Sequence, residues 1–219
     1  MDRYHAKAQS ATDGYKDVFG EDISDGELVW LLCVAQHETR CGDSWPGAYN
    51  WGAVQAGPPT VAERQRIDAG ELKAGDVVPG RGILHQDTNP ATGKYWVWFQ
   101  AFPSDRQGAA QLVVVLYKHN PEARAAARAD TNPADAMYRR GYYEGFHPGA
   151  RGVYGPGGKL LRVDPLNDAE AANVADYAGA LERLYPGWCA AIDSPAVVAR
   201  VQPDPGQPTP PGDLPEVDS

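Results

Sequence analysis

The sequence has little of what marks disulfide-stapled or membrane-spanning proteins. It holds only three cysteines, Cys33, Cys41 and Cys189, so at least one thiol stays unpaired. Cys33 and Cys41 stand eight residues apart on one predicted helix, about 12 Å of rise, which is too far for a disulfide. Cys189 could pair with either, but we expect three reduced thiols, as in a cytosolic product. The longest apolar run without a charge, residues 28–35, is far too short to cross a bilayer.

Positive charge is also scarce. The 20 Lys and Arg residues against 29 Asp and Glu residues give a formal net charge of −9. A field of this sign argues against nucleic acid and anionic lipid as partners, because phosphate binding needs clustered cations. The first 19 residues have no apolar stretch after a basic start, so no signal peptide is predicted. The sequence His37-Glu38-Thr-Arg-Cys41 lacks the second histidine of the zinc-protease helix, so we expect no metal.

The hydrophobic fraction of 42% is enough for a packed core and excludes wholesale disorder. We expect one domain over residues 1–201. Residues 202–219 hold six prolines and show no periodicity. We therefore expect an extended or disordered tail there, which could tether the protein to a larger assembly.

Helical patterns dominate the chain. The clearest helix begins at Ser24, which forms a capping box with Glu27, and should end near Gly42. Two strand-like segments, 83–87 and 94–102, predict a hairpin. This inventory predicts an α+β fold, mostly α, with a small β-hairpin lobe inserted after the second helix. Further helices are expected over 1–19, 61–69, 121–129, 133–140 and 167–185 and after Ser104, with turns and loops over 43–60 and 70–82.

Glu38 lies in the last turn of the helix that begins at Ser24. At 100° per residue it falls on the edge of the apolar stripe of that helix. The helix dipole disfavours a negative charge at this end, and partial burial acts in the same direction. A carboxyl that keeps its proton near neutral pH is what a general acid requires. The alternative is a rim glutamate paired with Arg40 or another cation.

The segment after this helix combines turn formers with aromatic and amide side chains. Trp45, Tyr49 and Trp51 stand among glycines and prolines, together with Asn50 and Gln55. Aromatic rings stack on sugar faces, and amides form hydrogen bonds with hydroxyl and N-acetyl groups. Next to an acidic side chain, this composition suits a carbohydrate. The alternative is an aromatic-rich turn that covers the core.

Four motifs in this chain resemble, in the same order, those of the lysozyme-like glucosaminidases of bacterial autolysins, flagellar hydrolases and phage endolysins. In that family a helix ends in a catalytic glutamate, and an Asn-aromatic-Gly turn then leads into a small β-lobe. The likeness runs over about residues 24–146. The matching stretches are Ala35-Gln-His-Glu-Thr-Arg-Cys-Gly42 with Tyr49-Asn-Trp-Gly-Ala-Val-Gln55, then Phe99-Gln-Ala-Phe-Pro-Ser104, Asn120-Pro121 and Gly141-Tyr-Tyr143.

The resemblance implies cleavage of a β-1,4 glycosidic bond with Glu38 as the general acid. Asp87, at the end of the first predicted strand, is the best positional match to the family's second acidic residue, with Asp43 and Glu144 as alternatives. If Asp87 is the base, the two carboxyl groups should lie about 6.5–9.5 Å apart. Tyr142 is implied to stabilise charge or to orient the sugar.

The implied substrate is the glycan strand of peptidoglycan. The chain would then be a peptidoglycan hydrolase of the N-acetylglucosaminidase or N-acetylmuramidase type, a bacteriolytic enzyme of cell wall degradation that needs no cofactor. Nucleic acid binding and membrane insertion are not expected. The implied substrate-binding residues are Tyr49, Asn50, Trp51, Gln55 and Tyr143.

Two alternatives stay open at this point. A lytic transglycosylase would use one acid/base glutamate and no water. A non-catalytic glycan-binding or structural module, in a phage tail or associated with the wall, would keep the fold without cutting. Because no signal peptide is predicted, a protein acting at the bacterial wall would need another route, such as phage lysis, a virion or a secretion system.

Overall fold

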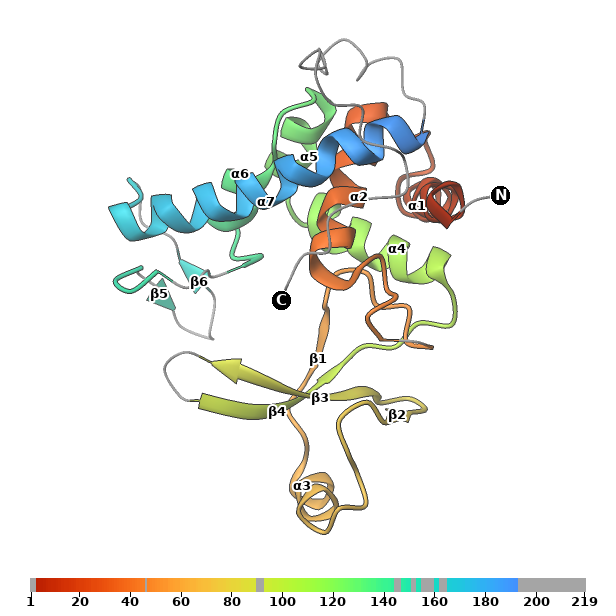
Figure 1. Ribbon diagram of the computed structural model, residues 1–219, viewed down its shortest axis with the longest axis vertical. Coiled ribbons are helices and arrows are strands. Elements are labelled where there is room, and N and C mark those ends of the chain that lie inside the picture. Colours follow the sequence, from red (N-terminus) through yellow and green to blue (C-terminus); the bar gives the residue numbers. More distant parts are fainter. Residues whose placement is uncertain are drawn as a thin grey trace, which may run out of the picture.

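The computed structural model describes residues 3–45, 47–89, 93–143, 147–150, 153–154, 160–161 and 165–192. Figure 1 shows two parts, a helical body and a β-lobe inserted between α2 and α4. The helices are α1 (Arg3–Phe19), α2 (Asp25–Thr39), α3 (Val61–Asp68), α4 (Asp105–Val113), α5 (Pro121–Arg128), α6 (Ala134–Arg139) and α7 (Asp168–Ile192), with a π-helical turn over Val114–Lys118. The strands are β1 (Gln55–Gly57), β2 (Val77–Val78), β3 (Gly82–Asn89), β4 (Gly93–Phe99), β5 (Val153–Tyr154) and β6 (Leu160–Leu161).

The predicted α+β class, mostly α, is confirmed in this coarse form. The prediction of residues 202–219 as a tail lies outside the described residues. None of the helices in the described part of the chain is long and apolar enough to span a membrane. Cys33, Cys41 and Cys189 are free and buried, as expected for three reduced thiols.

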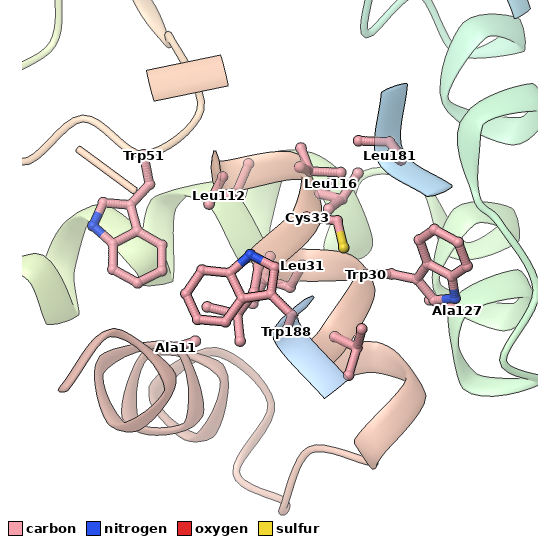
Figure 2. Packing of buried hydrophobic residues seen from close by; sticks show 14 of the residues in the cluster. Ala11, Trp30, Leu31, Cys33, Trp51, Leu112, Leu116, Ala127, Leu181 and Trp188 are labelled. Carbon is pink, nitrogen blue, oxygen red and sulfur yellow. The ribbon is translucent and has the colours of Figure 1, made fainter. Parts of the chain in front are cut away.

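Helix α2 forms the centre of the helical body. Ten of its residues are buried, on every side of the helix and not only along the predicted stripe. The reason is that α1, α4, α5 and α7 all pack against it, and a helix that is apolar all round is a core helix. In Figure 2, Trp30 and Leu31 of α2 lie among side chains from these neighbours, including Leu112 of α4, Leu181 of α7 and Ala11 of α1.

The predicted start of α2 is confirmed. The Ser24 hydroxyl accepts from the backbone N–H of Glu27 at 3.3 Å, and the Glu27 carboxylate accepts from the backbone N–H of Ser24 at 3.2 Å. This capping box supplies partners to two backbone donors that the helix leaves free. The cap predicted at Ser104 is also present, because its side chain accepts from the N–H of Gln107.

Helix α7 is longer than the sequence predicts. We expected it to end at Tyr185, but it continues through Pro186 to Ile192. Proline inside a helix removes a backbone hydrogen bond and bends the chain. Here Trp188 and Cys189, beyond the proline, are buried in the core, and Trp188 makes an edge-to-face contact with Tyr4 of α1 at 5.2 Å. This tertiary packing outweighs the local helix-breaking effect.

The β-lobe contains more strands than the predicted hairpin. Strands β3 and β4 confirm the hairpin, although β4 ends at Phe99 instead of residue 102. Two short strands extend it into an antiparallel sheet of order β1-β4-β3-β2. The described residues of 43–60 and 70–82 are turns and loops as predicted, except for β1, β2 and the first residue of β3. Strands of two or three residues are too short to show alternation in the sequence, and they form because the free edges of β3 and β4 offer backbone partners.

Both faces of this sheet are covered. Ile83 and Phe99, paired across β3 and β4, pack with Ala48 from the loop that follows α2. Leu84 and Trp98, the next pair, point to the opposite face and pack against the region of α3. Because side chains alternate along a strand, one register places one pair toward the α2 loop and the next toward α3. The loop after α2 is thereby packed onto the sheet.

Candidate active site

The C-terminal end of α2 is fixed by an unusual backbone. Arg40, Cys41 and Gly42 all have left-handed φ angles, of 53°, 57° and 83°. The N–H of Cys41 reaches back to the carbonyl of Ala35 at 2.9 Å, and the N–H of Gly42 donates to the hydroxyl of Thr39 at 2.9 Å. A side chain at position 42 would lie 3.0 Å from the Trp51 ring, so glycine suits both the angle and the space. This turn holds the last residues of α2 in place.

The buried side chain of Lys7, on α1, also stabilises this turn. Its ammonium group is buried and donates to the carbonyl of Cys41 at 2.8 Å and to the carboxylates of Asp43 and Asp105 at 2.8 and 2.7 Å. Burial alone would lower the pKa of Lys7, but the hydrogen bonds with the two carboxylates raise it. A charged lysine therefore links α1, the turn after α2 and the start of α4.

Glu38 projects from this last turn of α2. It is half-buried, and its Oε1 accepts a hydrogen bond from the Tyr177 hydroxyl at 2.5 Å. Among the described residues Glu38 has no ion pair with any Lys or Arg, so the alternative of a rim glutamate held by Arg40 is not what the structure has. Burial raises the pKa of Glu38 to about 7, and the hydrogen bond from Tyr177 opposes this rise. Near neutral pH the carboxyl is therefore both a proton donor and, once ionised, a proton acceptor.

Tyr177 was not among the residues predicted from the sequence. It lies on α7, 139 residues from Glu38 along the chain. Its ring stacks on Tyr143 at 3.9 Å between centroids with an 11° angle between planes, and His37 meets it edge-on at 4.8 Å. The only local signal is its helical spacing from the buried Leu181 and Leu184, which places it on the inward side of α7.

Tyr142 also lies close to Glu38. Burial and the charge of Glu38 raise the pKa of Tyr142 well above its usual value, so its hydroxyl stays protonated. Its Oη is buried and has no hydrogen-bond partner among the described residues. A Cβ added to Gly52 would lie 3.3 Å from this oxygen. The sequence motifs around residues 52 and 142 thus meet near the acid.

Asp87 lies on β3, and its carboxylate is held within the β-lobe. The Tyr95 hydroxyl donates to one oxygen at 2.8 Å, and the backbone N–H of Thr88 donates to the other at 2.8 Å. These contacts do not connect Asp87 to Glu38. Of the two alternatives for a second carboxylate, Asp43 is engaged by Lys7 and by Arg3 at 2.5 Å, and Glu144 lies outside the described residues.

Asn50 and Trp51 support the fold instead of presenting themselves to a ligand. The Asn50 amide donates to the carbonyls of Val54 and Gln100, both at 3.0 Å, and its oxygen accepts from the N–H of Val54 at 2.9 Å. Trp51 is fully buried, and its Nε1 donates to Asp105 at 2.9 Å. Neither side chain has a free face for a sugar, so we do not include them in a binding surface.

The other residues predicted to bind substrate remain available to different degrees. Gln55 is exposed on β1. Tyr49 is half-buried, and its carbonyl lies so close to Gly108 of α4 that a Cβ there would be 1.8 Å away. Tyr143 donates its hydroxyl to the carbonyl of Ala134 at 2.9 Å and keeps its ring against Tyr177. Of the three, only Gln55 is exposed.

No cluster of three or more His, Cys, Asp or Glu side chains that could hold a metal exists in the described part of the chain. His37, next to the acid, is half-buried against Tyr177. Burial, together with the nearby positive charge of Arg183, lowers the pKa of His37 below its usual value. The imidazole is therefore neutral at neutral pH and adds no charge beside Glu38.

Models of known protein families, curated proteins and solved structures were all compared with this chain, and none of them matches it. The class that the structure establishes is a mostly helical α+β protein with a four-stranded antiparallel lobe. At the C-terminal end of its central helix lies a half-buried glutamic acid, Glu38, close to Tyr142 and Tyr177. The likeness to lysozyme-like glucosaminidases stays a prediction from the sequence motifs.

Proposed function

We propose that this protein cleaves β-1,4 glycosidic bonds in the glycan strands of peptidoglycan, with Glu38 as the general acid. The observation that carries the proposal is the state of Glu38: half-buried, without an ion pair among the described residues, and with its pKa raised to about 7. A purely structural glutamate at a helix end would be ionised and held by a cation, or exposed to water. An acid that keeps its proton near neutral pH can give it to a leaving group.

The proposed reaction begins with proton transfer from Glu38 to the bridging oxygen of the glycosidic bond. As that bond breaks, positive charge develops on the anomeric carbon and ring oxygen. In hydrolysis, a water oxygen bonds to the anomeric carbon and its proton passes to a base, either Asp87 or another carboxylate. The substrate's own N-acetyl group could instead stabilise the positive charge on the anomeric carbon before water adds. In this proposal the Tyr142 hydroxyl, which is buried near Glu38, turns to form a hydrogen bond with the sugar.

A lytic transglycosylase follows the same first step but uses no water. The ionised Glu38 would then take a proton from a hydroxyl of the same sugar, whose oxygen closes on the anomeric carbon. Since the Asp87 carboxylate is engaged by Tyr95 and Thr88, a mechanism that needs one carboxyl group remains a full alternative. The two reactions leave different end groups on the released fragment: a reducing sugar after hydrolysis and an anhydro sugar after transglycosylation.

The experiment is the clearing of purified sacculi by the wild type, by Glu38→Gln and by the matched variant Glu122→Gln. Glu122 is exposed at the start of α5 and pairs with the half-exposed Arg140. We expect Glu38→Gln to lower the rate by about a hundredfold or more and Glu122→Gln to leave it unchanged. Mass spectrometry of the released fragments identifies the bond and the end group. Equal clearing by the wild type and Glu38→Gln would refute the proposal, and binding to sacculi without clearing by any variant would favour the non-catalytic module.

A further inference from the structure

Tyr177 brings a hydroxyl to Glu38 from the C-terminal helix. Its hydroxyl donates a hydrogen bond to the Glu38 carboxyl, at 2.5 Å from Oε1. Burial and the neighbouring charge of Glu38 raise the pKa of Tyr177 well above its usual value. The phenol therefore stays protonated at neutral pH, and its hydroxyl donates to Glu38.

The Tyr177 ring is held by contacts other than this hydrogen bond. Tyr143 stacks on one face at 3.9 Å, and His37 contacts the ring edge-on at 4.8 Å. Stacked and edge-to-face pairs of this kind each fix the plane of a ring. Tyr143 is itself held by its hydroxyl, which donates to the carbonyl of Ala134. The position of the Tyr177 hydroxyl oxygen is thus also fixed by ring contacts that do not involve Glu38.

From this geometry we infer that Tyr177 is a positioning residue, an inference that rests on the proposed function. Tyr177 orients the Glu38 carboxyl so that Oε2 carries the transferable proton. With the Tyr177 hydroxyl donating to Oε1, the carboxyl in its neutral form carries its own hydrogen on the other oxygen. A hydrogen bond donated to a carboxylate also favours the ionised form. Tyr177 therefore limits how far burial can raise the proton affinity of Glu38.

The titratable groups around Glu38 in the described structure are few. Tyr142 and Tyr177 face it from the segment after α6 and from α7, and both are neutral phenols. His37, on α2 itself, is kept neutral by burial and by the charge of Arg183. Since none of the three neighbours changes charge near neutral pH, a shift in the pH profile on removing one hydroxyl is attributable to that hydroxyl.

The test is the pair Tyr177→Phe and Tyr185→Phe, assayed on sacculi over pH 5–9 together with the wild type. Tyr185 is a matched control, because it lies on the same helix and donates its hydroxyl to a different carboxylate, Asp130. We expect Tyr177→Phe to move the alkaline limb of the rate profile up by about half to one pH unit. We also expect kcat to fall about tenfold with KM unchanged, because the acid is no longer oriented. Tyr185→Phe should leave the alkaline limb where it is.

A second readout separates this inference from the proposed function. Infrared difference spectra of the wild type minus Glu38→Gln give the protonated carboxyl band of Glu38, whose titration can be followed without substrate. An upward shift of that titration in Tyr177→Phe alone supports the inference even where no variant clears sacculi and the proposed function fails. An unchanged titration overturns it, as does a rise in KM with an unchanged pH profile, or a loss of activity that Tyr185→Phe shares equally.

Discussion

The two ends of α2 carry the most instructive contrast in the molecule, because each holds a glutamate in a different electrostatic setting. Glu27, in the first turn, is fully buried and accepts from Tyr15 at 2.7 Å, from Arg124 at 2.9 Å and from Arg128 at 3.2 Å. Glu38, in the last turn, meets one neutral phenol. The same helix therefore carries one buried carboxyl that is paired with cations and one that, among the described residues, is not.

The proton affinities of the two residues differ accordingly. Burial alone would raise the pKa of Glu27, but hydrogen bonds from Tyr15, Ser24 and Arg124 lower it below its usual value. At Glu38 burial dominates, and the pKa rises to about 7. The helix dipole adds to both trends, since it favours negative charge at the N-terminal end and disfavours it at the C-terminal end. Glu27 is thus suited to hold the fold, and Glu38 to exchange a proton.

The largest expected effect in this comparison concerns stability. Glu27→Gln should lower the free energy of unfolding by about 3 kcal/mol, because it leaves two partly exposed arginines facing an uncharged amide at the buried centre of their network. Glu38→Gln should raise the free energy of unfolding at neutral pH by on the order of 3 kcal/mol, since it removes a carboxyl that is costly to ionise there. Urea denaturation of both variants measures the difference. A Glu38→Gln variant as unstable as Glu27→Gln would show that the two ends do not differ in this way.

The second prediction uses pH to sharpen the same contrast. Between about pH 4.5 and 7, folded Glu38 keeps a proton that the unfolded chain releases, so wild-type stability relative to Glu38→Gln should fall with rising pH, by on the order of 3 kcal/mol. Glu27 should act in the opposite sense. Because its pKa is lowered in the folded state, its contribution is present above the unfolded pKa and is lost as the pH falls below it.

Denaturation curves at several pH values between 3 and 8 check both signs. The wild type minus Glu38→Gln gives the first trend, and the wild type minus Glu27→Gln gives the second. The variant Glu122→Gln serves as the control, because Glu122 is exposed. Two differences that run parallel with pH would contradict the assignment of opposite proton affinities.

The same contrast shows which features of the fold and the site can be predicted from the sequence. The capping box at Ser24 and Glu27 and the place of Glu38 in the last turn are local features, encoded within four residues or one helical period. The neighbours that set the proton affinities are not local. Arg124 reaches Glu27 across 97 residues, and Tyr177 reaches Glu38 across 139. No pattern within α2 could have named them, because they are brought there by the packing of α5 and α7 around the core.

In the loop after α2, by contrast, the local sequence indicated a binding role for two residues that the structure uses to hold the fold. Asn50 and Trp51 have the composition of a sugar-binding turn, and their local sequence led to that prediction. In the structure, buried hydrogen bonds to Val54, Gln100 and Asp105 occupy both polar groups. An amide or an indole has the same chemistry whether it meets a ligand or the chain's own backbone. Only burial separates the two uses, and burial here depends on contacts with α4 and β4.

The smallest effect concerns the cap that begins α2. Ser24→Ala removes the hydroxyl that bonds the N–H of Glu27 and also donates to the Glu27 carboxylate at 2.7 Å. The matched change is Thr60→Ala, which removes the same capping box from α3 of the β-lobe, at an exposed position. We expect Ser24→Ala to lower the free energy of unfolding by about 1–2 kcal/mol and Thr60→Ala by about 0.5–1 kcal/mol. The larger loss at Ser24 arises because its hydroxyl also helps hold a buried charge, whereas the Thr60 cap faces water. Equal losses in urea denaturation would mean that the Glu27 network does not depend on its serine, and that the cap of α2 acts on the backbone alone.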